Sequence, residues 1–427
     1  MGSRAGIVVT GTEVLTGRVA DRNGPWLAEQ LRIHGVDIAH IIVVGDRPND
    51  LRASLGFLAG TSVDLIITTG GLGPTADDLT AEVVGEFQGR PSVHDTALEA
   101  QIAGIVDRLS ADRGWQLDPV STAFASRKQA LVPVGANVLA PVGTAPGLIV
   151  AVAEGRAGPA IVVLPGPPWE LQGMWPAALA DPLVQAALGG REELRQRTIR
   201  LWGTPESELA ATLRSTAARL AGLEITTCLR DGELEIVTRY RPSAQQAYDD
   251  LEMVISQAHS NTLFSRDART IDDLVAAGLS TGNRSIATAE SCTGGLLAAR
   301  LTERAGSSAY LLGGLVVYSN AAKRELAGVP TQLIERVGAV SAEVAEAMAE
   351  GVRTRLGADI GVGITGIAGP GGGSAAKPVG LVYICVAGTG QTLARRVSLR
   401  GSRADIRLRC VVIALHLVWE LLAPPHP

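Results

Sequence analysis

The 427-residue sequence has only four cysteines, 4% aromatic residues and no excess of positive charge. The cysteines lie far apart and form no Cys-x-x-Cys pair, which argues against a zinc site and a disulfide framework and favours a reducing compartment. The net charge of −5 argues against a general role on nucleic acid or a membrane surface, because both kinds of binding depend on a basic face.

Long apolar runs and a signal sequence are also missing. No apolar stretch reaches the roughly 20 residues that a membrane-spanning helix needs. The first residues, MGSRAGIVVTGTEV, enter a strand pattern directly instead of a charged, apolar and small-residue signal. We therefore expect a cytoplasmic protein with no membrane partner.

Glycine and aliphatic residues are what the sequence has in abundance. There are 50 glycines, 46% hydrophobic residues and 19% charged residues, a balance typical of globular α/β proteins with many short turns. The length allows about three domains of roughly 150 residues each.

The first predicted domain spans residues 1–175. Short runs such as AGIVVT, VDIAHIIVVG and VDLIITTG alternate with amphipathic segments of helix length. Continuous Val/Ile runs separated by helices indicate parallel strands covered on both faces. The run IVVLPGPPWEL, where a strand meets several prolines, marks the end of this domain.

Two further domains follow, at residues 176–265 and 266–427. The middle one has the order strand, helix, strand, strand, helix, and Asp231-Gly232 between two alternating strands predicts a hairpin. The third again alternates strands and helices and contains the segments SIATAESCTGGLLAARL, LLGGLVVYSN and DIGVGITGIAGP. We predict an α/β fold for the outer domains and a small α+β fold for the middle one.

The segment AESCTGGLLAARL places Ser291 between a strand and a helix. A serine there either caps the helix or, with the helix amides beside it, serves as a nucleophile. The neighbouring Cys292 is an alternative nucleophile, although no histidine or arginine close in sequence lowers the pKa of its thiol. Tyr318 and Lys323 follow a later strand, and a desolvated lysine acts as a base where no histidine is available.

Four ordered motifs resemble the carboxy-terminal domain of the CinA family, the PncC-type nicotinamide mononucleotide (NMN) deamidases. They are AESCTGG, GGLVVYSNAAK, AVSAEVAEAMAEG and GITGIAGPGGGSAAKPVG. The amino-terminal segments GTEVLTGRVADRN, TTGGLGPTADDLT, VGTAPG and LPGPPWEL resemble the family's other half, which is related to the molybdopterin-binding MoaB/MogA proteins. The middle domain resembles the family's small KH-like domain.

The resemblance implies hydrolysis of the carboxamide of NMN to nicotinate mononucleotide and ammonia, without a cofactor. It implies Ser291 as the nucleophile, Tyr318 as a proton-transfer aid and Lys323 as the base or its electrostatic partner. Substrate contacts are expected from the helix start, which donates amides to the oxyanion, and from the glycine-rich loop with Lys377, which suits a phosphate. Asn320, Thr365 and Arg403 are expected to add polar contacts. The predicted substrate-binding residues are Thr293, Gly294, Gly295, Asn320, Thr365, Gly366, Gly369, Gly371, Lys377 and Arg403.

Two positions depart from the family pattern: Ser402 stands where relatives have Asp, and Ala140 where they commonly have Asn. In the first domain, Glu13, Asp77 and Asp78 are either helix-capping carboxylates or ligands of a divalent metal such as Mg, Mn or Co. The resemblance implies such a metal for an ADP-ribose pyrophosphatase, a second activity of some relatives.

Other interpretations remain open. The chain is alternatively a nucleotide- or pterin-binding protein that does not turn its ligand over. A role on DNA is disfavoured by the acidic charge and the absence of a basic stripe, and the middle domain lacks the Gly-x-x-Gly loop of RNA-binding KH domains. We expect a small nucleotide as substrate, no nucleic-acid partner, and a homodimer to which the middle domain contributes.

Overall fold

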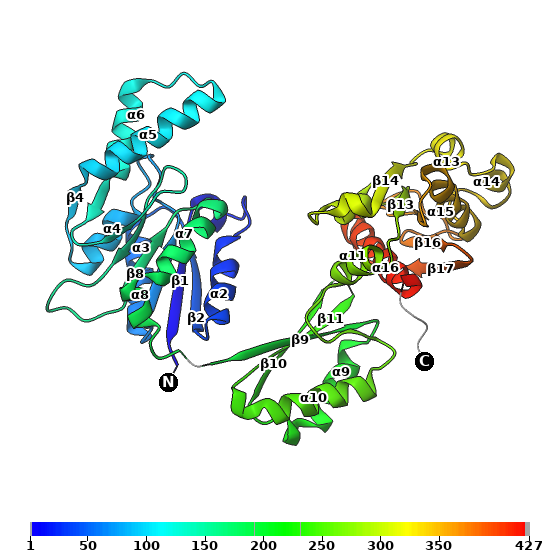
Figure 1. Cartoon of the computed structure of the whole chain (residues 1–427), viewed down its shortest axis with the longest axis horizontal. Coiled ribbons are helices and arrows are strands. Elements are labelled where there is room, and N and C mark those ends of the chain that lie inside the picture. Colours follow the sequence, from blue (N-terminus) through cyan, green and yellow to red (C-terminus); the bar gives the residue numbers. More distant parts are fainter. Residues whose placement is uncertain (1, 192, 231, 423–427) are drawn as a thin grey trace. The chain divides into compact units, whose positions relative to one another are not determined.

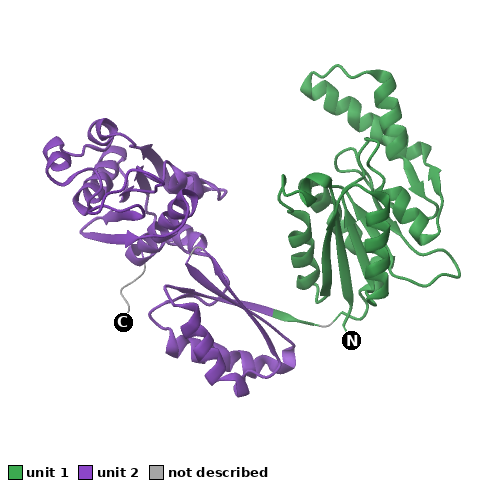
Figure 2. Ribbon diagram, turned by 180° about the vertical axis from the view of Figure 1, so that it is seen from behind, with its two compact units in different colours: residues 1–195 green, residues 196–427 purple. Residues whose placement is uncertain are grey.

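The computed structural model describes residues 2–191, 193–230 and 232–422. By contacts the chain divides into two compact units, residues 1–195 and 196–427 (Figure 2). The first unit therefore extends past the predicted boundary at residue 175. Among the described residues, no helix combines the length and the apolar character that crossing a bilayer requires.

The first unit is built on a six-stranded sheet in the order β2-β1-β3-β8-β7-β6. Four neighbouring strands, β2, β1, β3 and β8, are parallel as predicted, and β7 and β6 add an antiparallel edge. The strands are β1 Arg4–Thr10, β2 Asp37–Val44, β3 Leu65–Thr69, β6 Asn137–Leu139, β7 Gly147–Val150 and β8 Ala160–Leu164, with a separate pair β4 Ser92–His94 and β5 Leu131–Pro133.

Both faces of this sheet are covered, because successive residues of β1 enter different apolar cores. Val8 belongs to one core, and Ile7 and Val9 belong to the other. This explains the continuous apolar runs in the sequence. The helices are α1 Thr12–Leu15, α2 Asn23–Ile33, α3 Pro48–Gly60, α4 Thr80–Gln88, α5 Thr96–Arg113, α6 Pro119–Gln129, α7 Pro168–Ala180 and α8 Pro182–Ala187.

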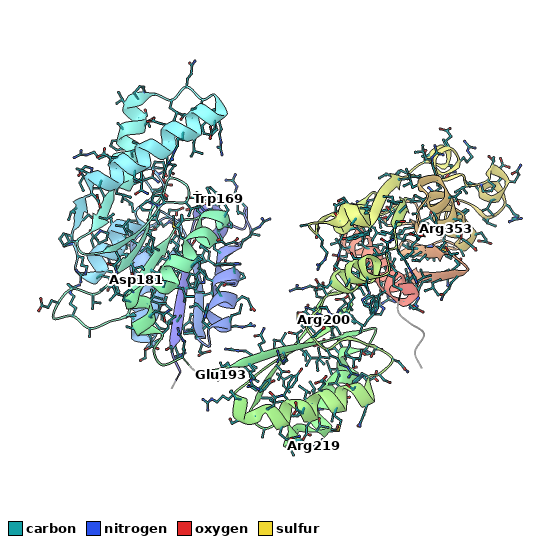
Figure 3. All side chains as sticks on the ribbon, in the orientation of Figure 1. Trp169, Asp181, Glu193, Arg200, Arg219 and Arg353 are labelled. Atoms are coloured by element: carbon teal, nitrogen blue, oxygen red, sulfur yellow. The ribbon has the colours of Figure 1, made fainter. Side chains whose placement is uncertain are left out.

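Two local features complete the first unit. Helices α5 and α6 pack together and project beyond the sheet (Figure 1). Asp181, labelled in Figure 3, separates α7 from α8 and caps α8 by accepting the Leu183 amide at 2.8 Å. It also accepts the Asn137 side-chain amide at 2.8 Å, which ties the end of α7 to the sheet edge.

The second unit begins with a four-stranded sheet in the order β10-β11-β9-β12. The predicted strand-helix-strand-strand-helix order is present, and a short fourth strand follows it. Strands β10 and β11 form the predicted antiparallel hairpin, although Asp231 at its turn lies outside the described residues. The elements are β9 Arg195–Trp202, α9 Glu206–Ser215, β10 Leu223–Arg230, β11 Glu233–Tyr240, α10 Gln245–Ala258 and β12 Leu263–Ser265.

A five-stranded sheet in the order β14-β13-β15-β16-β17 forms the rest of the second unit. Strands β14, β13 and β15 are parallel, whereas β16 and β17 are antiparallel to their neighbours. Helices α11 and α16 contribute to one core and α15 to the other. The strands are β13 Ile286–Glu290, β14 Leu311–Val316, β15 Ile360–Gly366, β16 Leu381–Gly388 and β17 Gln391–Ser398. The helices are α11 Ile271–Thr281, α12 Leu296–Thr302, α13 Asn320–Ala327, α14 Thr331–Val337, α15 Ala342–Leu356 and α16 Arg403–Leu422.

A histidine connects helix α16 to the four-stranded sheet of the second unit. His416 of α16 is buried and lies 2.7 Å from a carboxylate oxygen of Glu233 on β11. Its ring stacks on Trp202 with centroids 4.1 Å apart and meets the edge of Phe264 at 4.8 Å. Burial lowers the pKa of His416, and Glu233 opposes that shift only in part.

We expect the second unit to lose stability as the pH falls below about 6.5, the ordinary histidine pKa. The folded-state pKa of His416 is lowered, so below that pH the unfolded chain binds a proton that the folded chain does not, which favours unfolding. His416→Gln keeps a donor for Glu233 but does not titrate, and it should reduce this pH dependence. The unfolding temperature of wild type and of His416→Gln is measured between pH 5 and 8. Equal slopes of unfolding temperature against pH in the two proteins would contradict the assignment to His416.

Candidate functional site

Ser291 lies in a tight turn between β13 and α12. Every residue of β13 is buried, and the Ser291 amide continues the sheet by donating to the Ile364 carbonyl at 2.9 Å. The turn then passes through Gly294 and Gly295, whose φ angles of 61° and 92° favour glycine. This backbone path returns the chain from the strand into the helix within a few residues and fixes Ser291 at the strand's carboxyl end.

Lys323 reaches Ser291 from the neighbouring helix α13. Its Nζ lies 2.9 Å from Ser291 Oγ and donates to the carbonyl of Val317 at 3.0 Å and to that of Tyr318 at 3.3 Å. The side chain of Lys323 is 2% exposed and Ser291 is 7% exposed. The structure therefore brings together the serine and the lysine that the sequence predicted, in a nearly closed environment.

Burial lowers the pKa of Lys323, because it disfavours the charged ammonium form. The nearby Cys292 acts in the opposite direction. A lysine whose pKa is lowered in this way holds a larger share of neutral amine near neutral pH, and a neutral amine accepts the proton of a hydroxyl.

Cys292 is buried in the apolar core to which α11 and α16 contribute. Its thiol is hydrogen-bonded to Cys410 of α16, which is the main reason that the pKa of Cys292 is lowered; Lys323 and Arg403 contribute further. Lys323 and Arg403 are far from Cys292 in sequence, so sequence reasoning did not identify them as its neighbours. The same contact raises the pKa of Cys410. The hydrogen bond from Lys323 nevertheless goes to Ser291.

Tyr318 is exposed, and its hydroxyl points to an arginine. Arg403 donates one Nη to the Tyr318 hydroxyl at 2.8 Å and the other to the Gly369 carbonyl at 2.7 Å. Arg403 thus connects the strand-to-helix segment after β14 with the glycine-rich loop. In this conformation Tyr318 contacts Lys323 through its backbone carbonyl, and its hydroxyl serves Arg403.

Two residues predicted to bind substrate have structural partners. The Lys377 ammonium donates to the carbonyls of Val337 and Val340, both at 2.7 Å, and so closes the end of α14. The Thr365 hydroxyl donates to the Ala339 carbonyl at 2.7 Å. These contacts use the Thr365 hydroxyl proton and two of the three donors of Lys377, and they tie both side chains to the loop that leads from α14 into α15.

The predicted glycines and Asn320 differ in their surroundings. A Cβ on Gly366 would lie 2.6 Å from Val382, and one on Gly369, at φ +81°, would lie 2.6 Å from Val379, so both are required by packing. A Cβ on Gly371 would meet nothing within 4 Å. Asn320 is exposed at the first position of α13.

Sequence reasoning missed Glu290, the residue before the nucleophile. Its carboxylate, 1% exposed, accepts the Gly295 amide at 3.1 Å, and the Gly294 amide donates to the Ser291 carbonyl at 3.1 Å. Neither glycine amide is therefore free for an oxyanion, contrary to expectation. The remaining predicted residue of the turn, Thr293, has a buried hydroxyl with no partner among the described residues. The signal in the sequence that could have identified Glu290 was a charged residue at the end of a buried strand.

The amino terminus of α16 closes the same turn. Ser402 and Asp405 form a reciprocal cap: Asp405 accepts the Ser402 amide at 2.8 Å and its hydroxyl at 2.7 Å, and the Asp405 amide donates to the Ser402 hydroxyl at 3.3 Å. Ser402 thus caps the start of α16. One turn further, Arg407 donates to the Thr293 carbonyl at 2.7 Å, a contact that sequence reasoning did not predict.

In the first unit, the predicted acidic residues lie near the carboxyl ends of parallel strands. The Thr75 hydroxyl lies 2.6 Å from a carboxylate oxygen of Asp77 and 2.6 Å from one of Asp78, so the two acceptors share its single hydrogen, and the bond to Asp77 is the main reason that the pKa of Asp77 is lowered. Asp77 and Asp46 line one small hollow. Glu13 is exposed on α1.

These carboxylates do not form a protein-only metal cage. Within the described residues, no three His, Cys, Asp or Glu side chains are close enough to hold a metal ion. Mg²⁺ is, however, commonly bound by one or two carboxylates together with substrate phosphates, and Asp77 with Asp46 fits that arrangement. The departing residue Ala140 is exposed after β6.

Sequence reasoning also missed Glu170 of α7, which is 7% exposed. Burial raises the pKa of its carboxyl, while the amides of Gly143 and Ala145 oppose the shift. A Cβ on Gly143 would lie 2.4 Å from that carboxyl carbon, so the loop after β6 requires glycine there.

Comparisons with known proteins cover both units. Residues 268–422 match the family described as CinA C-terminal domain, and residues 6–185 match the probable molybdopterin binding domain. The chain is 58% identical over 426 residues to a CinA-like protein of Mycolicibacterium vanbaalenii, covering 99% of both chains. It is 53% identical over 428 residues to a CinA-like protein of Mycobacterium tuberculosis, covering 99% of this chain and 98% of the relative.

Among solved structures, the competence/damage inducible protein CihA from Agrobacterium tumefaciens is 42% identical, with a TM-score of 0.35, over 37% of this chain and 99% of that one. The molybdopterin biosynthesis enzyme MoaB from Thermus thermophilus is 20% identical, with a TM-score of 0.29, over 44% of this chain and 97% of that one. Because the similarity to the mycobacterial relatives extends over nearly the whole length, the chain belongs to the CinA family.

Proposed function

We propose that this chain hydrolyses the carboxamide of NMN to nicotinate mononucleotide and ammonia, with Ser291 as nucleophile and Lys323 as base. The observation that carries the proposal is the 2.9 Å contact between Lys323 Nζ and Ser291 Oγ in a buried environment. Family membership supports it. The activity is an amide hydrolysis that needs no cofactor, since a serine and a neutral amine supply the nucleophile and the proton transfer.

In the first step, neutral Lys323 takes the proton of Ser291 Oγ, and the oxygen attacks the carboxamide carbon. The carbonyl π electrons move to the oxygen, which becomes an oxyanion. Because the amides of Gly294 and Gly295 have internal acceptors, we assign oxyanion stabilisation to the Thr293 amide, which has no acceptor among the described residues.

In the second step, the Lys323 ammonium returns its proton to the leaving nitrogen. The C–N bond breaks, ammonia leaves, and an ester links nicotinate mononucleotide to Ser291. Water then attacks the ester while Lys323 takes a proton from it and returns one to Ser291 Oγ. The sum is one water consumed and one ammonia released.

The nucleotide phosphate is assigned to Arg403 and the glycine-rich loop. Arg403 already contacts the Gly369 carbonyl and Tyr318 at the edge of this site. A guanidinium carries further donors that suit a phosphate. The other cation predicted for the phosphate, Lys377, is held by two carbonyls, so we assign the main share of phosphate binding to Arg403.

Ser291→Ala should reduce NMN deamidation to the background rate while the chain stays folded. The Lys323 ammonium keeps two carbonyl acceptors in that variant, so the loss of stability should be about 1 kcal/mol. Ammonia release measures the activity and thermal unfolding measures the fold. Cys292→Ser is the matched control and should retain substantial activity; an inactive control beside an active Ser291→Ala would assign the nucleophile to Cys292.

Lys323→Met and Arg403→Ala should affect different kinetic constants. Removing a positioned base lowers kcat by roughly 10²- to 10⁴-fold, whereas losing a phosphate contact that is equal in the ground and transition states mainly raises KM. Steady-state kinetics with NMN separate the two. A Lys323 variant with normal kcat and a raised KM would move that residue from base to substrate ligand.

A metal-dependent ADP-ribose pyrophosphatase is a second candidate function, for the first unit. The observation that favours it is the hollow lined by both Asp77 and Asp46. The hydrogen bond from Thr75 lowers the pKa of Asp77 and so favours the charged carboxylate that a metal ion needs. When bound, a divalent ion would neutralise pyrophosphate charge. The chain's own role would be to hold that ion through these two carboxylates.

Asp77→Asn together with Asp46→Asn should abolish ADP-ribose cleavage and leave NMN deamidation unchanged, since these residues and the deamidase residues belong to different units. Chromatographic detection of AMP and ribose 5-phosphate, in the presence of magnesium, manganese or cobalt, measures the first activity. If the wild-type chain cleaves no ADP-ribose with any of these ions but binds the nucleotide, the first unit is a binding module.

A further inference from the structure

Glu290 is a buried carboxylate that the proposed chemistry does not use. It ends β13 directly before Ser291 and is 1% exposed. Four donors reach its two oxygens: the amides of Gly295 at 3.1 Å, Leu297 at 3.1 Å and Ala298 at 2.9 Å, and the Thr288 hydroxyl at 3.2 Å.

The pattern of these bonds differs from an ordinary helix cap. A usual cap side chain belongs to the residue next to the helix and accepts one or two of its first amides. Glu290 instead lies five residues before Gly295 and satisfies three amides at once. It therefore fastens the end of the strand to the start of α12, and the segment between the two fastened points is the turn that carries Ser291.

Both ends of the Ser291 turn are then fixed independently of Lys323. The Ser291 amide is held by β15 through the Ile364 carbonyl at 2.9 Å, and Gly295 is held by Glu290. Hydrogen bonds from neutral amides to a buried carboxylate are about twice as strong as those between neutral groups. The hydrogen bonds to the Glu290 carboxylate are therefore what makes this attachment rigid.

We propose that Glu290 is a positioning residue for the nucleophile: its carboxylate clamps the start of α12 to β13 and thereby holds Ser291 Oγ within reach of Lys323. This proposal rests on the proposed function where it takes NMN as the substrate. The role of Glu290 in placing Ser291 can be measured without NMN. Glutamine at this position has the same size, yet its amide NH₂ would face N–H donors, so at least one hydrogen bond is lost and the turn loosens.

The test compares wild type with Glu290→Gln in the full chain by two readouts. With NMN, kcat should fall by about 10²-fold, because a small displacement of a nucleophile is that costly, while KM stays within about twofold. The pH dependence of kcat should keep its position, because Lys323 and not Glu290 exchanges the proton. Glu343→Gln, the same change at the exposed first turn of α15, is the matched control and should have no effect.

The second readout does not depend on NMN. A sulfonyl fluoride labels an activated serine: the O–S bond forms, fluoride leaves, and the serine proton passes to Lys323. Intact-mass measurement of the labelling rate at Ser291 should show the same loss in Glu290→Gln as kcat does. Wild type that is labelled but does not hydrolyse NMN overturns the proposed substrate, and the labelling rates then decide the role of Glu290.

Three results would overturn the proposal. One is full activity and labelling in Glu290→Gln. Another is a shift of the pH profile, which would make Glu290 a proton-transfer group. The third is wild type that is neither labelled at Ser291 nor active. If Glu290→Gln does not fold, Thr288→Val removes a single donor to the carboxylate and should slow labelling about fivefold; an unchanged rate there also contradicts the clamp.

Discussion

The burial of one ammonium group beside a serine organises the carboxy-terminal half of this protein. Lys323 is almost fully enclosed, and a charged amine in that place is unfavourable unless acceptors surround it. The acceptors are Ser291 Oγ and the carbonyls of Val317 and Tyr318. They come from the ends of β13 and β14, two neighbouring parallel strands, so the contact exists only when the sheet is formed. The lowered pKa of Lys323 follows from the same enclosure.

The surrounding elements hold this pair in place through polar contacts between backbone and side chains. Glu290 connects the Ser291 turn to α12, Arg407 connects it to α16, and Arg403 connects α16 to the glycine-rich loop. A CinA-family chain thus places its serine where a strand, two helices and a loop converge.

The sequence predicted the elements well where apolar periodicity was strong, as in β1, β3 and the β10–β11 hairpin. It also pointed to Ser291 and Lys323, which the structure places 2.9 Å apart, at the end of β13 and in α13. It did not predict that Lys377 and Thr365 would be held by carbonyls, or that Glu290 would take the Gly295 amide. Such partners lie tens of residues apart or depend on the exact path of a turn, and neither composition nor periodicity records them.

The most direct test of this account is the pKa of Lys323 in the intact chain. The sequence contains only three lysines, Lys128, Lys323 and Lys377, so ¹³C-labelled lysine gives an NMR spectrum that Lys323→Met assigns. Titration of the Lys323 side-chain carbon next to Nζ should give a pKa below the ordinary value of 10.5, because burial disfavours the ammonium form. A pKa at or above 10.5 would contradict the assignment of Lys323 as the base that activates Ser291.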